Sequence, residues 1–243
     1  MTIVTIESGF EILLEVQATD LVIDQLHHKR DSIPERAERD KHLQAIAATE
    51  QERKPVDETL HDLERTQRRQ EDEVASVVTK ITDIDKSLYS GTVSSPRDLQ
   101  AMQAEIEALK RRQNALEEEL LATMEQVEPV AMAKAQLDET KGSHLTEVER
   151  LNSLIEAKEA VIDGELAEVV AKRSSLAISV EPGILATYEK LRAHLGGVGV
   201  ARLDGGRCTG CHLTLPAAEL DSLRHAGEGI PIFHEECGRL LVR

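Results

Sequence analysis

Residues 99–127 read LQAMQAEIEALKRRQNALEEELLATMEQV, and this stretch indicates the fold more clearly than any other part of the chain. Its apolar side chains recur at alternating spacings of three and four residues, as at Leu99, Met102 and Ile106. This alternation is the heptad seam of a coiled coil. The phase continues without a slip as far as Leu176, and 15 of its 23 seam positions are apolar. Disordered segments do not keep such a period, so we predict a long helix here.

A second heptad run, from Val56 to Leu88, precedes the first. Between the two runs, residues 90–97 read Ser-Gly-Thr-Val-Ser-Ser-Pro-Arg, a cluster of turn-forming residues. The proline in this cluster is well placed to open a new helix. The sequence therefore predicts a helical hairpin with its tip near residues 90–97.

The two arms of this hairpin are matched in length. Residues 10–89 and residues 97–176 each number 80, and antiparallel pairing about the tip makes facing residue numbers add to about 186. This pairing brings the basic block 65–69 opposite the glutamates 117–119, a complementarity that supports the register. Pro55 and Pro129 lie at nearly the same height, so we expect a shared bend near residues 55 and 129.

The start of the hairpin is less regular than the rest. The region before Val56 keeps the heptad phase less cleanly, and Pro34 lies within it. A proline inside a helix removes a backbone hydrogen bond and clashes with the preceding turn. We therefore expect the lower third of the hairpin to be bent or broken by a short connection.

The composition excludes several classes of protein. The chain has 243 residues with 45 Asp and Glu against 29 Lys and Arg, a net charge of −16, and only two Phe, two Tyr and no Trp. So few rings argue against a large globular core, and so much negative charge argues against a nonspecific nucleic-acid coat. No basic leader with an apolar run and no membrane-length apolar stretch is present, so we expect a cytoplasmic protein without a membrane partner.

The composition changes at residues 181–183, Glu-Pro-Gly, which we expect to end the long helix. We therefore expect a mainly α chain with two domains. Residues 1–181 form a long antiparallel coiled-coil helical hairpin, and residues 182–243 form a short helix followed by a small module. In this module we predict a helix over 184–195 and a strand over 198–203.

The module contains all three cysteines of the chain. Cys208-x-x-Cys211 and His234-x-x-Cys237 each place two metal donors on one tight turn, so four donors can converge on a tetrahedral Zn²⁺. So small a module, with few large apolar side chains, needs a metal or a disulfide for stability. We expect a zinc ribbon with one structural zinc per chain. A closed four-ligand site leaves no open position for a reacting water, so we expect no enzymatic activity.

The fourth zinc ligand has three histidine candidates. His212 follows the first cysteine pair directly, and His225 lies in a segment that reads as a helix. His234 is favoured because it completes the second x-x spacing with Cys237.

Three segments together resemble a known family. They are Cys-Thr-Gly-Cys-His-Leu-Thr-Leu-Pro at 208–216, Cys-Gly-Arg-Leu-Leu at 237–241 and the tip segment at 89–100. They resemble the bacterial coiled-coil hairpin proteins that carry a C-terminal C4-type zinc ribbon, and the resemblance covers nearly the whole chain. It implies zinc ligands at the three cysteines. The chain departs from the family pattern at His234, where the family has a cysteine, so the implied set is Cys₃His.

The resemblance also implies a cytoplasmic, non-enzymatic protein that acts as a nucleic-acid-binding or transcription-related regulatory adaptor. From residue 183 onward, seven basic residues balance seven acidic ones, so contact with RNA or DNA depends on local arginines. The candidates are Arg202, Arg207, Arg239 and Arg243. The alternative is a protein-interaction scaffold, in which the arm or the tip around Val93 and Leu99 docks a protein partner and the zinc is purely structural. The oligomeric state is left open.

Overall fold

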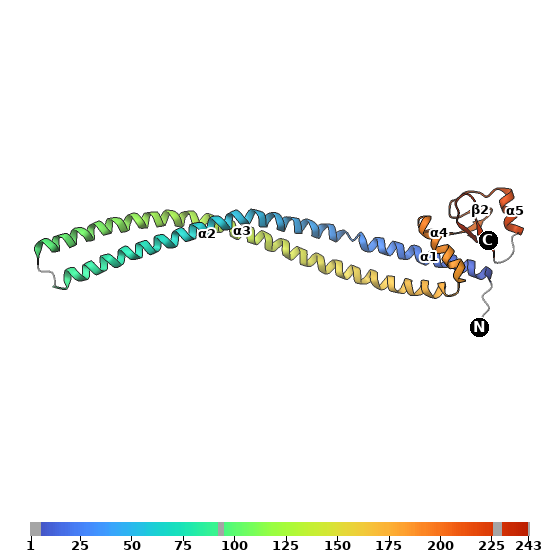
Figure 1. The fold of residues 1–243 in the computed structure, drawn as a ribbon, viewed down its shortest axis with the longest axis horizontal. Helices are drawn as coiled ribbons and strands as arrows, with labels where there is room; N and C mark the ends of the chain where they lie inside the picture. Colours follow the sequence, from blue (N-terminus) through green and yellow to red (C-terminus); the bar gives the residue numbers. More distant parts are fainter. Residues whose placement is uncertain (1–5, 92–94, 226–229, 243) are drawn as a thin grey trace. The chain divides into compact units, whose positions relative to one another are not determined.

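The computed structural model describes residues 6–91, 95–225 and 230–242, and among them five helices and four strands (Figure 1). In chain order the elements are α1 (Ile6–Asp31), α2 (Pro34–Tyr89), α3 (Pro96–Ala177), α4 (Pro182–His194), β1 (Val200–Asp204), β2 (Arg207–Cys208), α5 (Ala217–His225), β3 (Ile232–Phe233) and β4 (Leu240–Val242). Val93 of the predicted tip and Arg243 lie outside the described residues. The chain forms two compact units, one made of residues 1–36 and 153–243, the other of residues 37–152.

The unit of residues 37–152 contains most of the predicted hairpin. α2 ends at Tyr89 and α3 begins at Pro96, on either side of the predicted tip, and the two helices lie side by side (Figure 1). The buried apolar side chains of this unit include Leu60 of α2 and Ile106 and Leu116 of α3, all at predicted seam positions. The periodicity therefore identified the apolar stripe that each arm buries, and the hairpin prediction is confirmed.

Among the described residues of this unit, three ion pairs join the two arms. They are Glu50–Lys141 at 2.7 Å, Arg53–Asp138 at 3.0 Å and Asp57–Lys134 at 3.0 Å. The residue numbers of each pair add to 191, against the predicted sum of about 186. Long charged side chains reach along the helix surface, which accounts for an offset of about one turn.

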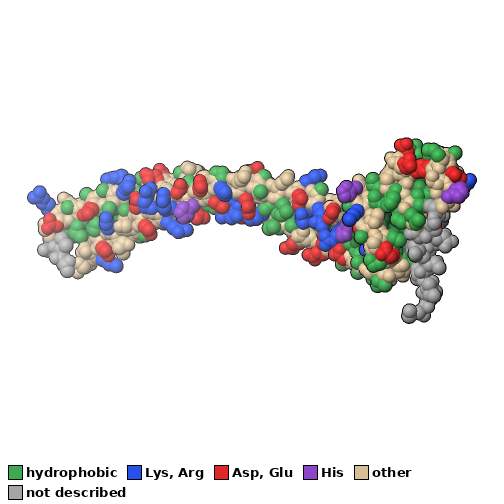
Figure 2. Space-filling model, turned by 45° about the vertical axis from the view of Figure 1, so that its right-hand side comes forward, with side chains coloured by type: hydrophobic (Ala, Val, Ile, Leu, Met, Phe, Trp, Pro, Cys, Tyr) green, Lys and Arg blue, Asp and Glu red, His purple; other side chains and the backbone are tan. Residues whose placement is uncertain are grey.

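The predicted pairing of charged blocks across the arms is wrong. Arg65, Arg68 and Arg69 pair instead within α2, with carboxylates three or four residues away. Exposed pairs of this kind contribute little, and local i,i+4 geometry competes well with a partner on the other arm. On the face drawn in Figure 2, acidic and basic side chains are interspersed along the long helices.

The prolines differ in their effect. The break before Pro34 is confirmed, because α1 ends at Asp31 and α2 starts at Pro34. Pro55 and Pro129 lie inside α2 and α3, which continue as helices across them. The shared bend near these two prolines stays a prediction.

The other unit combines the start and the end of the chain. α1 packs against the C-terminal part of α3 through an apolar cluster that includes Leu26, Ile155 and Ile162. The four strands form one sheet in the order β2-β1-β4-β3, in which β1 and β4 are parallel and the other neighbours antiparallel. The predicted domain boundary at 181/182 falls inside this unit.

A single apolar core joins the sheet to the helices of this unit. Its buried members come from α1, α4, β1, β4 and the connection between α3 and α4, namely Phe10, Leu13, Val16, Val180, Tyr188, Val200, Leu240 and Val242. A second cluster, around Ala201, Leu215 and Leu223, includes the buried Cys208 and is packed against by Cys211 and Cys237. Helices α1 and α4 therefore cover one set of strand side chains, and the cysteines and α5 lie against the other.

Candidate metal centre

The first pair of donors lies on a tight turn after β2. The amide of His212 donates to the carbonyl of Cys208 at 2.8 Å, which closes the turn around Cys211. The backbone at Gly210 lies close to the Arg239 side chain, so that a Cβ at this position would lie 2.5 Å from Cδ of Arg239 and would displace that side chain. The absence of a side chain at Gly210 therefore lets Arg239 pack closely against this turn.

The second pair lies on a matching turn between β3 and β4. The amide of Gly238 donates to the carbonyl of His234 at 2.7 Å, and Gly238 has a φ of 68°, in the left-handed region that favours glycine. The amide of His234 in turn donates to the carbonyl of Arg239 at 2.9 Å. The two turns thus face each other across the small sheet.

These turns bring four metal donors together. One ligand atom from each of Cys208, Cys211, His234 and Cys237 lies within 4.8 Å of the others. Nδ1 of His234 lies 3.3 Å from Sγ of Cys211 and 3.0 Å from Sγ of Cys237. Typical zinc–nitrogen and zinc–sulfur distances in a tetrahedron put such atoms about 3.5 Å apart. The donor set therefore fits one structural zinc ion, with Nδ1 as the nitrogen that faces the sulfurs.

Burial and hydrogen bonding act differently on the thiols of this cluster. Burial raises the pKa of Cys208. Burial also opposes ionisation of Cys237, but hydrogen bonds from the backbone of Arg239, from His234 and from the Arg239 side chain outweigh it and lower the pKa of Cys237 to about 6. Since the thiolate is the metal-binding form, the lowered pKa of Cys237 favours zinc binding by this cysteine at neutral pH.

The two other candidate histidines lie outside this cluster. His212 is exposed, and its carbonyl accepts a hydrogen bond from Nε of Arg207 at 2.6 Å. His225 is also exposed, and its Nδ1 lies 2.8 Å from the carbonyl of Asp221 on its own helix. His234, by contrast, is fully buried among the cysteines. The geometry thus favours the histidine that the x-x spacing favoured.

The candidate nucleic-acid arginines make contacts within the chain. The Arg202 guanidinium pairs with both carboxylate oxygens of Glu11 in α1, at 3.1 and 2.5 Å. Arg207 donates to His212, as above, and Nε of Arg239 donates to the carbonyl of Val198 at 3.0 Å. These arginines lie on or beside the sheet, and each is held by a partner in the same unit.

Two buried polar residues of α1 connect it to its neighbours, Gln17 to the ribbon and Asp20 to α3 and α4. The side-chain amide of Gln17 donates to the carbonyl of Val200 and accepts from its amide, both at 2.8 Å. Asp20 accepts from the hydroxyl of Tyr188 at 2.8 Å and from Nε of Arg173 at 3.0 Å. Burial and this contact with Asp20 raise the pKa of Tyr188 well above its ordinary value.

The buried roles of Gln17 and Asp20 were not predicted from the sequence. Leu13, Val16, Gln17 and Asp20 share one helix face at spacings of three, four and seven residues. Gln17 and Asp20 occupy positions of this face where apolar residues are expected. Since buried polar groups need partners, their placement was the available signal for buried hydrogen bonds. What those partners were could not be inferred from α1 itself.

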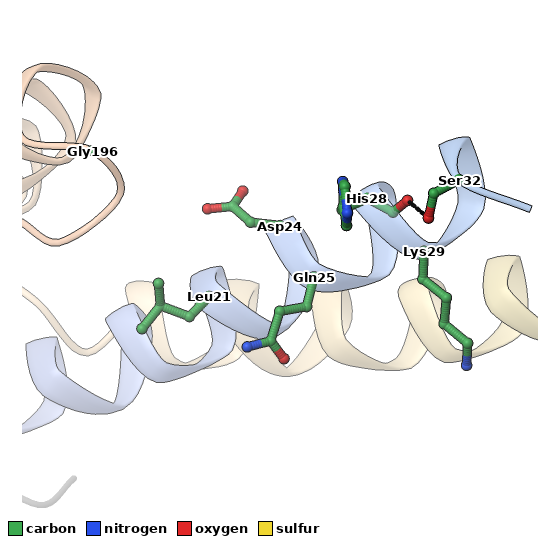
Figure 3. A pocket seen from close by; sticks show the side chains of 7 residues that line it. All are labelled: Leu21, Asp24, Gln25, His28, Lys29, Ser32 and Gly196. Carbon is green, nitrogen blue, oxygen red and sulfur yellow. Dashed lines mark hydrogen bonds between the residues drawn. The ribbon is translucent and has the colours of Figure 1, made fainter.

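A hollow in the same unit lies beside α1. Its lining is Leu21, Asp24, Gln25, His28, Lys29, Ser32 and Gly196, and its volume is about 580 Å³ (Figure 3). The carboxylate of Asp24 accepts from Arg192 of α4 at 2.7 Å, and the hydroxyl of Ser32 donates to the carbonyl of His28 at 2.7 Å. These polar groups connect α1 to α4 and end α1, which are structural roles.

Among the described helices, none combines the length and the apolar character that crossing a membrane requires. This agrees with the absence of a membrane-length apolar stretch in the sequence.

Comparisons with known proteins agree with the fold. An uncharacterised Mycobacterium tuberculosis protein, Rv2229c, is 28% identical over 238 residues, which span 95% of this chain and 94% of that protein. A solved structure from Mycobacterium smegmatis has a TM-score of 0.78 at 23% identity and covers 98% of both chains. The structure of CT398 from Chlamydia trachomatis has a TM-score of 0.63 at 17% identity and covers 97% of this chain and 98% of its own. Both structures show likeness of fold.

Two family descriptions match the chain. Residues 207–241 match the C4-type zinc ribbon domain, in agreement with the four-donor cluster, although His234 replaces one cysteine of a C4 set. Residues 16–196 match the CT398-like coiled coil hairpin domain, over well more than half of the chain. This protein is therefore a member of the CT398-like coiled-coil hairpin family with a C-terminal zinc ribbon.

Proposed function

We propose that this chain is a non-catalytic, zinc-binding adaptor that docks a protein partner on its coiled-coil arm. The observation that carries the proposal is an exposed strip on α3 in the unit of residues 37–152. Leu121, Met124 and Met132 are 59%, 45% and 67% exposed there. They share one face of the helix, since Met124 lies almost one turn and Met132 about three turns beyond Leu121. We call these three residues, with the neighbouring glutamates, the acidic apolar strip.

The charge around the strip indicates what it would bind. Glu117, Glu118, Glu125 and Glu128 are exposed and lie three or four residues from the apolar members. Residues 113–133 contain five glutamates and no Lys or Arg. In the described part of the chain no ion pair involves these glutamates. A complementary partner is an amphipathic helix whose apolar face is bordered by Lys and Arg.

The ribbon has a different role in this proposal. Three of the four arginines that could contact phosphate are held within the chain, by Glu11 and by backbone carbonyls. Breaking such contacts would reduce the gain from binding nucleic acid. We therefore favour a structural zinc and a protein-binding hairpin over a ribbon that binds RNA or DNA.

The test uses a synthetic basic amphipathic peptide, with Leu at helical spacing and Lys beside it, and a scrambled peptide of the same composition. We expect the full-length, zinc-loaded protein to bind the helical peptide more tightly than the scrambled one. Leu121→Glu and Met132→Glu should each weaken binding about tenfold or more. Leu145→Glu is the matched control, because Leu145 is 43% exposed on another face of α3.

Equal binding of the two peptides, or full binding by the strip variants, would refute the proposal. The same protein is titrated with RNA and with duplex DNA across a salt series. Salt-sensitive binding that Arg202→Ala and Arg207→Ala abolish would favour the nucleic-acid alternative instead.

A further inference from the structure

Two histidines meet across the arms of the unit formed by residues 37–152. Nδ1 of His42 in α2 lies 2.9 Å from Nδ1 of His144 in α3, and the ring centroids are 5.1 Å apart with the planes tilted by 55°. Both side chains are partly buried. His144 is a seam position of α3, and His42 lies one turn before the buried Ile46. An imidazole pair therefore occupies a layer of the coiled coil that is usually apolar.

This arrangement suits a metal ion as well as a proton. In the hydrogen bond, one ring donates and the other accepts, so both Nδ1 atoms are directed at the same short gap. Zn²⁺, Ni²⁺ and Cu²⁺ bind imidazole nitrogen at about 2.0–2.1 Å. Two such nitrogens lie about 2.9 Å apart around a 90° angle and about 3.4 Å apart around a tetrahedral one. The nitrogen–nitrogen distance therefore needs to change by at most about half an ångström, and the two rings turn so that both lone pairs point at the ion.

We infer that His42 and His144 form a second metal site, which bridges the two arms and takes a divalent transition-metal ion. Water completes the coordination, since the chain supplies two ligands to the ion. With half as many protein ligands as the ribbon, this site binds more weakly than the Cys₃His cluster and exchanges its ion more readily. Binding fixes the spacing of the arms at this layer, because the ion is held from both sides.

Charged groups of both signs lie near the pair, and Lys41 directly precedes His42. Glu38 lies one turn before His42 on the same face of α2 and is exposed. Lys141 lies one turn before His144, but its ammonium group is held by Glu50 at 2.7 Å. Lys141 of α3 and Arg39 of α2 are thus each paired with a carboxylate, the second with Asp40 at 2.7 Å.

The experiment titrates the full-length, zinc-loaded protein with Ni²⁺ and follows its thermal unfolding. An ion that binds only when the arms are paired raises the folding equilibrium constant about 100-fold at 100 times its Kd. We expect Ni²⁺ to raise the unfolding temperature while the zinc content stays at one per chain. Substoichiometric Cu²⁺ should give an electron paramagnetic resonance spectrum with two nitrogen ligands.

Three variants make the assignment. His42→Asn and His144→Asn should each lose the Ni²⁺-dependent shift and leave at most one imidazole on Cu²⁺. His61→Asn is the matched control, because His61 is an exposed histidine on α2. The inference fails if either His42→Asn or His144→Asn keeps the shift or if His61→Asn removes it, since the ion is then bound by other groups. The Cu²⁺ spectrum tests the assignment even if a variant is less stable, because it reports the number of nitrogen ligands on the ion directly.

Discussion

Replacing Gln17 tests how the ribbon is attached to the hairpin. Gln17 is 8% exposed, Val200 is fully buried, and two hydrogen bonds of 2.8 Å join the side-chain amide of Gln17 to the backbone of Val200. The amide of Leu240 in the parallel partner strand β4 donates to Gly199, and β2 pairs with β1 only at residues 203 and 204. On the side of β1 that faces β2, none of the described strands reaches Val200. Gln17 therefore supplies the hydrogen-bond partners of the Val200 amide and carbonyl.

The magnitude follows from the two backbone groups that would lose their partner. A buried donor or acceptor left without a hydrogen bond costs about 1–3 kcal/mol. Gln17→Met keeps the volume of the side chain and removes both hydrogen bonds, so we expect it to lower the free energy of unfolding by about 2–4 kcal/mol once the added apolar burial is counted. Gln25→Met is the control, because Gln25 is an exposed glutamine on the same helix.

The assay combines urea unfolding of the zinc-loaded protein with native-state hydrogen exchange. We expect the Val200 amide to lose protection in Gln17→Met and to keep it in Gln25→Met, because only the first substitution removes its acceptor. If Gln17→Met stays within about 0.5 kcal/mol of the unchanged protein and the Val200 amide stays protected, then the pairing does not attach the ribbon to α1.

The other predictions concern zinc and the buried tyrosine. Removing zinc with a chelator should abolish hydrogen-exchange protection in the four strands, because the ribbon depends on its metal. The strong helical circular dichroism of the chain should persist, because the long arms do not depend on zinc. Loss of the helical signal together with the zinc would contradict this. His234→Cys should retain one tightly bound zinc per chain and His234→Ala should lose it, whereas His212→Ala should retain it; zinc content after dialysis against a competing chelator is the measurement. Tyr188→Phe should lower the free energy of unfolding by about 1.5–3 kcal/mol, since it removes a buried hydrogen bond to the Asp20 carboxylate; an unchanged urea midpoint would show that the hydroxyl is dispensable.

Much of the fold could be predicted from local patterns in the sequence. A coiled coil repeats the same contact every few residues, so the seam from Leu99 to Leu176 could be identified from spacing alone. Turn residues and Pro96 located the tip for the same reason, since their backbone preferences are local. The two x-x pairs of the ribbon were likewise identifiable, because each pair lies on a single turn.

Contacts whose partners lie far apart in the chain could not be predicted in this way. Suitable carboxylates for Arg65, Arg68 and Arg69 lie both on α2 and on the other arm. In the structure, each of these arginines pairs with a carboxylate of α2. The phase of the first helix was weak, because α1 packs against a sheet as well as a helix and its buried face therefore includes Gln17 and Asp20. Tertiary context overrides a period when an element has two different neighbours.

By itself, the sequence determined the helical hairpin, its tip and the four zinc donors, because each is encoded within a short stretch or a repeating one. The tertiary structure decided what those parts touch. Gln17 and Val200 are separated by 183 positions, His42 and His144 by 102, and no local pattern relates them. Their pairing arises only after the arms align and the ribbon folds, when burial requires each polar group to find a partner.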